Sequence, residues 1–209
     1  MNISDQRTSI DVQRDGLSNS ALGYPILINR TRVPSCEHLF HSLKFPEHPL
    51  LQQSIISTPS PNSARLMSLK EYNKVKVRPD WKDIQIDVMD FCLRMKLIWN
   101  WVAFGKVLSE TNHQEIRECS SRRDRFWGVS PKNGGFVGEN HLGKLLMTLR
   151  DEYLGDDNES LRFLRPPTSL SLKFLGREID VIDRRRHLLR EGTRLSTHVA
   201  SVRPISLSH

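Results

Sequence analysis

The stretch DWKDIQIDVMDFCLRMKLIWNWV, residues 80–102, decides the fold of this chain. Its apolar side chains recur at alternating steps of four and three residues, at Ile84, Val88, Phe91, Met95, Ile98 and Val102. That spacing puts them on one face of an α-helix, with Asp80 as the predicted cap and Trp81 at its start. We therefore predict a long amphipathic helix whose apolar face forms the core of a mainly helical protein.

The segments on either side of this helix predict shorter elements. Ser35 is the expected N-cap of a helix over 35–45, and four prolines break residues 46–61 into short pieces. Together with the elements below, these helices predict a compact α+β fold that is mainly helical and has a small sheet. The remaining predicted elements are a strand at 24–28, helices at 62–72 and 140–154, a strand at 106–111, and loops at 112–123 and 134–138.

Composition and charge exclude several classes of protein. The chain has 209 residues, a formal net charge of +7 and three cysteines, which argues against a disulfide-stabilised secreted protein. No signal peptide is recognised and no run approaches the roughly 18 apolar residues of a membrane span, so a cytoplasmic protein without a membrane partner is expected. The basic excess favours an anionic partner such as a phosphate, nucleotide or nucleic acid, and is equally compatible with simple solubility.

Changes in composition divide the chain into three parts. Residues 1–16 are polar and are predicted to be a flexible N-terminus, and residues 17–155 form the predicted folded domain. Residues 156–209 are a basic C-terminal extension that we predict to be partly disordered, above all in its last dozen residues. Within this extension one helix is expected near 176–191.

The segment PSCEHLFHSLKF, residues 34–45, carries the first candidate site. At 100° per residue, Glu37, His41 and Lys44 share one helix face, and apolar side chains occupy the other. One interpretation is a reactive group of a carboxylate, an imidazole and an amine. The other is an ordinary surface ion pair between Glu37 and His41 or Lys44, which periodicity alone favours.

Two further motifs precede the last long helix. Asp124 stands three residues before Trp127-Gly128, so its carboxylate is able to lie beside an aromatic wall. In isolation, this motif favours the commoner arrangement of a buried tryptophan beside a salt-bridged aspartate. The segment Gly138–Lys144 has glycines at a predicted helix start, where free backbone amides are able to bind a phosphate. The alternative is that it only caps this helix and allows it to pack closely against its neighbours. It is not a Walker A loop, because Leu145 follows the lysine.

Neither a metal nor a cofactor is expected. A zinc site would have to use Cys36, His38, His41 and His48, whose spacing matches no standard ligand pattern.

Taken in chain order, the motifs of residues 17–154 resemble the NADAR superfamily, the YbiA-like N-glycosidases. Single motifs are unspecific, but their order and spacing are specific. The segments are Leu17-Ser18-Asn19, Tyr24-Pro25-Ile26, Pro34-x-x-Glu37-His38-x-Phe40-x-x-x-Lys44-Phe45, Ala64-Arg65, Trp81 with its helix, Asp124-x-x-Trp127-Gly128, and Asn140-x-Leu142-Gly143-x-Leu145-Leu146-Met147-x-Leu149-Arg150.

The resemblance implies a compact fold that cleaves an N-glycosidic bond at ribose C1. The implied substrates are phosphorylated ribosylamino intermediates of riboflavin biosynthesis, or ADP-ribosyl groups, including ADP-ribosyl-guanine in nucleic acid. The implied catalytic residues are Glu37, Lys44 and Asp124, with Lys44 either forming an imine with the sugar or leaving the attack to water. The implied substrate-binding residues are Ser18, Asn19, Trp81, Trp127, Gly128, Asn140 and Gly143.

The chain also departs from the family pattern. Ser20 stands where the family usually has an aromatic residue, and His41 where it usually has glutamine. A first strand is not evident in residues 1–16, and residues 112–123 look like an insertion. These departures leave two alternatives to the enzyme: a module that binds ADP-ribose or a nucleotide without turnover, and a nucleic-acid-binding protein that acts through its basic extension.

Overall fold

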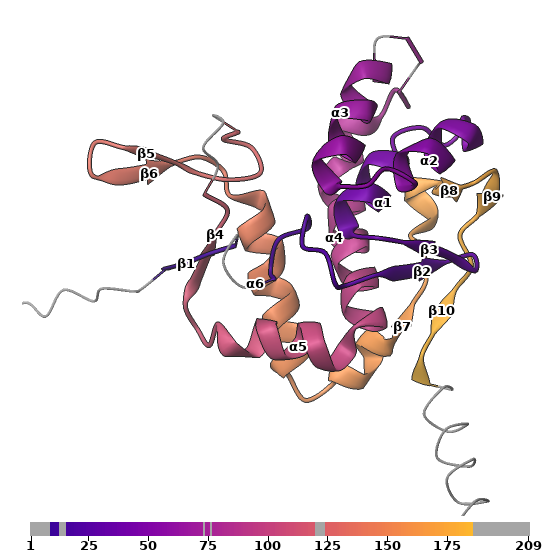
Figure 1. Cartoon of the computed structure of the whole chain (residues 1–209). Coiled ribbons are helices and arrows are strands. Elements are labelled where there is room, and N and C mark those ends of the chain that lie inside the picture. The colour runs from indigo at the N-terminus through magenta and orange to yellow at the C-terminus, as the bar shows by residue number, and fades with distance from the viewer. Residues whose placement is uncertain (1–8, 13–15, 73, 76, 120–123, 186–209) are drawn as a thin grey trace, which may run out of the picture.

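The protein is built mainly from helices, and short paired strands lie around them, which confirms the predicted class (Figure 1). The computed structural model describes residues 9–12, 16–72, 74–75, 77–119 and 124–185. None of the helices in these segments has the length and apolar character that crossing a membrane requires. The helices are α1 (Cys36–Ser42), α2 (Pro49–Ile56), α3 (Pro61–Tyr72), α4 (Trp81–Trp99), α5 (Trp101–Glu110) and α6 (His141–Leu154), with 3-10 turns η1 (Asn158–Arg162) and η2 (Thr168–Leu170).

The named strands pair two by two. β1 (Ser9–Asp11) runs parallel to β4 (Glu115–Arg117), and the other pairs are antiparallel. Pairs of two or three residues contribute few hydrogen bonds, so packing between helices supplies most of the stability. The antiparallel pairs are β2 (Ile26–Ile28) with β3 (Thr31–Val33), β5 (Ser130–Lys132) with β6 (Gly135–Val137), β7 (Phe163–Leu164) with β10 (Ile182–Asp183), and β8 (Lys173–Phe174) with β9 (Arg177–Glu178).

Helix α4 lies at the centre of the molecule (Figure 1). It packs against α1, α5, α6 and β2, so its C-terminal half is covered on every side rather than along one stripe. The predicted stripe is confirmed at Val88, Phe91, Met95 and Ile98, each at most 3 % exposed. The intervening Met89, Cys92, Leu93 and Leu97 are buried as well.

A break after α4 corrects two predictions. Asn100 leaves the helical conformation (φ −128°, ψ 43°), and its side-chain amide donates to the carbonyls of Lys96 at 2.9 Å and Pro25 at 3.1 Å. The helix predicted over 80–102 therefore ends at Trp99, and Val102, predicted in the core, is 79 % exposed. The strand predicted over 106–111 is wrong, because α5 runs through to Glu110 and buries Phe104 and Leu108 at helical spacing.

Two predicted caps use their side chains differently. Ser35 occupies the N-cap position of α1, but its hydroxyl bonds to Nδ1 of His38 at 2.8 Å instead of to a backbone amide. Asp80 occupies the N-cap position of α4, and its carboxylate accepts a bidentate pair from Arg78 at 2.7 and 2.8 Å. In both places the side chain of the N-cap residue forms its hydrogen bond with another side chain and not with a backbone amide of the first helical turn.

Two segments predicted as unstructured contain strands. β1 is the first strand that the sequence did not reveal, and its partner β4 lies in the segment predicted as a loop over 112–123. Ile10 lies opposite Ile116 in this pair. Neither residue belongs to a recognisable strand pattern, and the two are far apart in the sequence, so the pairing was not predictable from local sequence. The glycine-rich loop predicted at 134–138 is part of a hairpin, β5–β6, which projects away from the helices (Figure 1).

The described part of the C-terminal extension packs on the helical core. Leu170, Leu172, Phe174, Ile179 and Ile182 belong to the same buried cluster as α4. The helix predicted near 176–191 is not formed in the described residues 176–185, where β9 and β10 stand instead. The rest of that helix, the final dozen residues and most of the predicted flexible N-terminus lie outside the described residues.

Candidate active site

A pocket of about 580 Å³ opens between the N-terminal segment and the helices α1, α3 and α4. It is lined by eight of the ten predicted site residues. The eight are Ser18, Asn19, Glu37, Lys44, Trp81, Asp124, Trp127 and Gly128. The structure thus brings together residues that are more than a hundred positions apart in the sequence.

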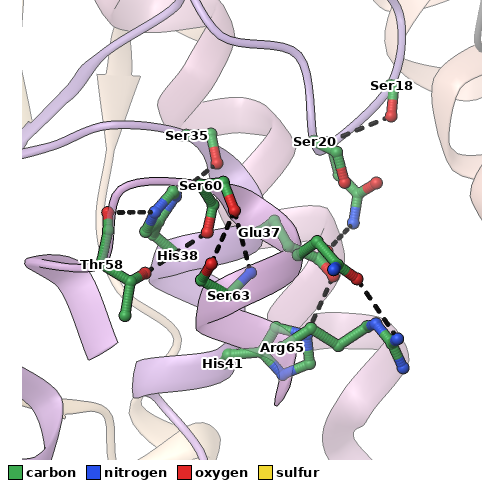
Figure 2. A network of polar contacts seen from close by, with 12 residues as sticks. Ser18, Ser20, Ser35, Glu37, His38, His41, Thr58, Ser60, Ser63 and Arg65 are labelled. Carbon is green, nitrogen blue, oxygen red and sulfur yellow. Dashed lines mark hydrogen bonds and ion pairs between the residues drawn. The ribbon is translucent and has the colours of Figure 1, made fainter. Parts of the chain in front are cut away.

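Helix α1 and the turn after it supply three ionisable groups of this pocket. The helix predicted over 35–45 is shorter, because α1 ends at Ser42, so Glu37 and His41 lie on α1 and Lys44 follows its C-cap residue. All three line the pocket and are only 8 %, 5 % and 8 % exposed, so the interpretation as a surface ion pair is wrong. The carboxylate of Glu37 accepts from Nε2 of His41 at 2.9 Å and from the Asn19 amide at 2.5 Å (Figure 2). Both carboxylate oxygens are therefore fixed by neutral donors on either side.

The balance of burial and charge keeps Glu37 ionised. Burial alone would raise the pKa of the Glu37 carboxyl, but the hydrogen bond from His41 and the charges of Lys44 and Arg65 outweigh burial and lower it. Burial also lowers the pKa of His41, although the neighbouring Glu37 acts in the opposite direction. At neutral pH the pair is thus a carboxylate and a neutral imidazole that donates through Nε2.

Lys44 is a buried amine with an unusual protonation equilibrium. Burial, partly offset by Glu37 and reinforced by Arg65, lowers its pKa to about 8. Its Nζ lies 5.4 Å from the ring centroids of both Phe40 and Trp81, so aromatic faces replace part of its lost hydration. An amine in this state is largely protonated at pH 7, yet its neutral form is far more populated than that of a solvated lysine.

Three aromatic rings form one wall of the pocket. Phe40 stands between Trp81, with ring centroids 5.0 Å apart, and Trp127, at 5.5 Å and a right angle. Trp81 is buried, and Trp127 is half-buried with one part open to the pocket. This wall offers an apolar face against which a base or a sugar can lie.

Asp124 has a structural task beside its place at the pocket. It is exposed, and its Oδ1 accepts from the backbone amides of Phe126 at 3.1 Å and Trp127 at 3.0 Å. The carboxylate therefore caps the turn that presents Trp127. Gly128 follows, and a side chain there would collide with the backbone of Glu118.

Asn140 and Gly143 are the two predicted site residues that do not line the pocket. Asn140 is 6 % exposed, donates to the Ile116 carbonyl at 2.9 Å and accepts from the Glu118 amide at 3.0 Å. Gly143 lets α6 approach the backbone of Ile116 closely. Both residues join α6 to β4, and so they position the pocket wall from behind.

A second polar network docks α1 against the start of α3 (Figure 2). His38 is fully buried, bonding to the Ser35 hydroxyl through Nδ1 and to the Thr58 carbonyl through Nε2 at 3.3 Å. Ser60 then caps α3 by accepting from the Ser63 amide at 3.1 Å. The network sets the distance between α1, which carries Glu37, and α3, which carries Arg65.

Several pocket residues received no role from the sequence. Arg65 is half-buried, lines the pocket and donates to Asn62 at 3.3 Å; it appears in the Ala64-Arg65 motif, which was the available signal. Glu118 lines the pocket from within the segment that looked like an insertion, so no spacing pointed to it. Within the described residues no cluster of three or more metal-ligating side chains occurs.

Comparisons with known proteins give the family and the fold of the chain. The model of the NADAR domain family matches residues 6–154. The solution structure of the Escherichia coli protein YbiA superposes with a TM-score of 0.57 at 29 % identity, covering 70 % of this chain and 85 % of that one.

Two curated relatives carry the name riboflavin biosynthesis protein. The one from Vibrio vulnificus is 34 % identical over 131 residues, which are 62 % of this chain and 34 % of the relative. The chloroplastic PYRR of Arabidopsis thaliana is 37 % identical over 112 residues, which are 52 % of this chain and 18 % of the relative. The chain therefore spans about a third or less of the length of these relatives.

Proposed function

The chain belongs to the NADAR family, and we propose that it is an N-glycosidase that hydrolyses the bond between ribose C1 and an amine nitrogen. The observation that carries this proposal is the Glu37 carboxyl group, buried at an aromatic-walled pocket and hydrogen-bonded at both oxygens. A fixed and largely buried carboxylate is suited to stabilise positive charge, because it needs no reorganisation as that charge appears.

The proposed reaction uses this charge directly. As the C1–N bond breaks, its electron pair leaves with the nitrogen, and the sugar acquires oxocarbenium character next to Glu37. Water attacks C1 and gives a proton to Glu37, while the departing nitrogen takes a proton from an acid in the pocket. The lowered pKa of Glu37 favours its action as the base and electrostatic partner rather than as the acid.

Lys44 supports two routes. Its ammonium, with a pKa of about 8, is an acid of suitable strength for the departing nitrogen. Its amine form is able to attack C1 instead: the original C1–N bond breaks, its nitrogen leaves with the electron pair and the proton lost by the lysine, and the opened sugar remains on Lys44 as an imine that water then hydrolyses. The two routes differ in whether the sugar is ever bonded to the enzyme, and a reducing trap distinguishes them.

The proposed substrates are a phosphorylated ribosylamine or an ADP-ribosyl compound. Lys44 and Arg65 supply positive charge to the pocket, as phosphate binding requires, and Trp127 offers a face for the base. The names of the relatives favour the ribosylamine of riboflavin biosynthesis. An ADP-ribosylated guanine in nucleic acid is the other proposed substrate of the same chemistry.

A mass-spectrometric assay of base release tests the proposal. A phosphorylated ribosylaminopyrimidine and an ADP-ribosylated guanine oligonucleotide are offered in parallel to the wild type, to Glu37→Gln and to Glu110→Gln. We expect release from one substrate, lost in Glu37→Gln and retained in Glu110→Gln, whose exposed carboxylate lies on α5. Saturable binding of both compounds without any release would contradict the enzyme and identify a binding module.

A further inference from the structure

The most unusual charged group outside the pocket is Lys96, on the central helix α4. Its side chain is 1 % exposed, yet none of the described carboxylates forms an ion pair with it. Nζ donates instead to the carbonyls of Gly16 at 2.6 Å and Ser18 at 3.0 Å, with that of Leu17 at 3.5 Å. The ring centroids of Tyr24 and Phe104 lie 4.5 and 3.9 Å from the same atom.

Burying a charge in this way costs free energy, and an apolar residue of the same length would avoid that cost. Burial lowers the pKa of Lys96 to about 8, while the neighbouring Cys36 acts in the opposite direction. What an apolar residue could not do is gather three consecutive carbonyl oxygens around one point. An ammonium has three donors and no acceptor, which matches this set of oxygens.

The segment that Lys96 holds continues directly into the pocket. Gly16, Ser18, Asn19, Ser20 and Ala21 all line it. Asn19 touches α1 twice: its carbonyl accepts from the Glu37 amide at 2.9 Å and its side chain donates to the Glu37 carboxylate. Lys96 does not line the pocket, so its influence on Glu37 passes through this segment.

We propose that Lys96 is a positioning residue that fixes residues 16–19 above α1, so that Asn19 holds the Glu37 carboxylate in place. The effect of Lys96 on catalysis rests on the proposed function, whereas its effect on the contact between Asn19 and Glu37 does not. In this role Lys96 acts behind the reacting groups and touches no substrate.

Two readouts that require no turnover test the proposal on the whole chain. The first is amide hydrogen exchange in residues 17–21, and the second is the pKa of the Glu37 carboxyl followed by carbon-13 NMR. In Lys96→Met we expect exchange in 17–21 to accelerate on the order of tenfold or more, because the segment loses its charge-assisted hydrogen bonds. We also expect the pKa of Glu37 to rise toward that in Asn19→Ala, since a hydrogen bond to a carboxylate favours its charged form.

Leu97→Ala is the matched control. Leu97 is the next residue of α4, is buried and lines a separate cavity with Leu149, so this variant weakens the core and keeps the Lys96 ammonium with its three carbonyl partners. Neither readout should change in it. Unchanged exchange or an unchanged Glu37 pKa in Lys96→Met overturns the proposal whatever the enzyme assay gives.

Lys96→Gln, which keeps part of the donor set, is the second variant, in case the methionine variant does not fold. It should show intermediate changes in both readouts. If neither variant folds, Lys96 is a folding residue and the positioning role is wrong. The two proposals are distinguishable. If the wild type releases no base but the expected changes in exchange and pKa occur, the proposed function is wrong and the positioning role of Lys96 is still supported.

Discussion

At the scale of single residues, His41 determines the state of Glu37. A neutral imidazole donates to Oε1 of Glu37 at 2.9 Å, at the position where the family resemblance leads us to expect glutamine. Glutamine also offers a neutral donor at similar reach and cannot ionise. We predict that His41→Gln keeps base release within a fewfold of the wild type, whereas His41→Ala lowers kcat by roughly 10- to 100-fold, the cost of a hydrogen bond to a charged group.

The same pair predicts a pH effect of definite sign. The His41 bond lowers the pKa of Glu37, so the carboxylate persists as pH falls. Without that bond Glu37 takes up a proton at higher pH, and the acid limb of kcat/KM moves to higher pH in His41→Ala. Steady-state rates between pH 4 and 7 measure this limb. An unmoved limb in the alanine variant would mean that Glu37 is not the group that titrates.

Lys44 makes a second prediction at this scale. Its pKa of about 8, against 10.5 for the unperturbed group, means that raising the pH through 8 converts ammonium into nucleophilic amine. Incubation with ribose 5-phosphate and borohydride should label Lys44 increasingly as the pH rises through about 8, and labelling should level off above that pH. Peptide mass spectrometry reads the label, with exposed Lys82 as internal reference and Lys44→Arg as the blank. Labelling no greater than that of Lys82 throughout would remove the imine route.

Individual residues also show how far sequence reasoning extends. Helix geometry predicted Glu37, His41 and Lys44 on one face, and the structure brings all three to the pocket although α1 ends at Ser42, before Lys44. Lys96 gave no signal, because a lysine on a helix reads as a solvated charge until the carbonyls around it are known. The role of Asn140 was equally hidden, since its partners Ile116 and Glu118 lie in a segment that looked like an insertion.

At the scale of elements, the contact between α6 and β4 predicts a consequence for Gly143. A methyl group there would meet the Ile116 carbonyl and the Asn140 side chain, forcing α6 away from the strand. We expect Gly143→Ala to lower the free energy of unfolding by about 1–3 kcal/mol. Gly135→Ala is the control, because its nearest neighbour would be 3.8 Å away in the exposed β5–β6 hairpin. Denaturant unfolding compares the two, and equal stabilities would show that α6 adjusts freely.

Helices proved more predictable than strands, for a physical reason. The periodicity that identifies a helix is local, so α3, α6 and most of α4 were visible in the sequence. β1 and β4 have three residues each and owe their pairing to a contact between Ile10 and Ile116, which no local pattern encodes. The end of α4 depended similarly on Asn100 finding the Pro25 carbonyl, a partner 75 residues away.

At the scale of the whole molecule, the extension after residue 155 completes the core from the side opposite the hairpin (Figure 1). Gln52, fully buried on α2, donates to the Ser42 carbonyl at 3.3 Å and the Lys173 carbonyl at 2.9 Å. The end of α1, the helix that carries Glu37 and His41, is thereby tied to the extension. The match to the family model stops at residue 154, so this support comes from residues outside the matched part of the chain.

Truncation measures what this support contributes. A chain of residues 1–155 lacks five apolar side chains that are buried in the full chain, and it exposes the part of the core that they cover. These are Leu170, Leu172, Phe174, Ile179 and Ile182. At about 1.5–3 kcal/mol for each buried side chain, the loss is comparable to the entire stability of an ordinary domain. We predict that residues 1–155 do not unfold cooperatively, whereas residues 1–185, which keep every contact described for the extension, melt within a few degrees of the full chain. Calorimetry decides between these outcomes, and a cooperative transition of residues 1–155 near that of the full chain would show that the extension only covers a core already stable without it.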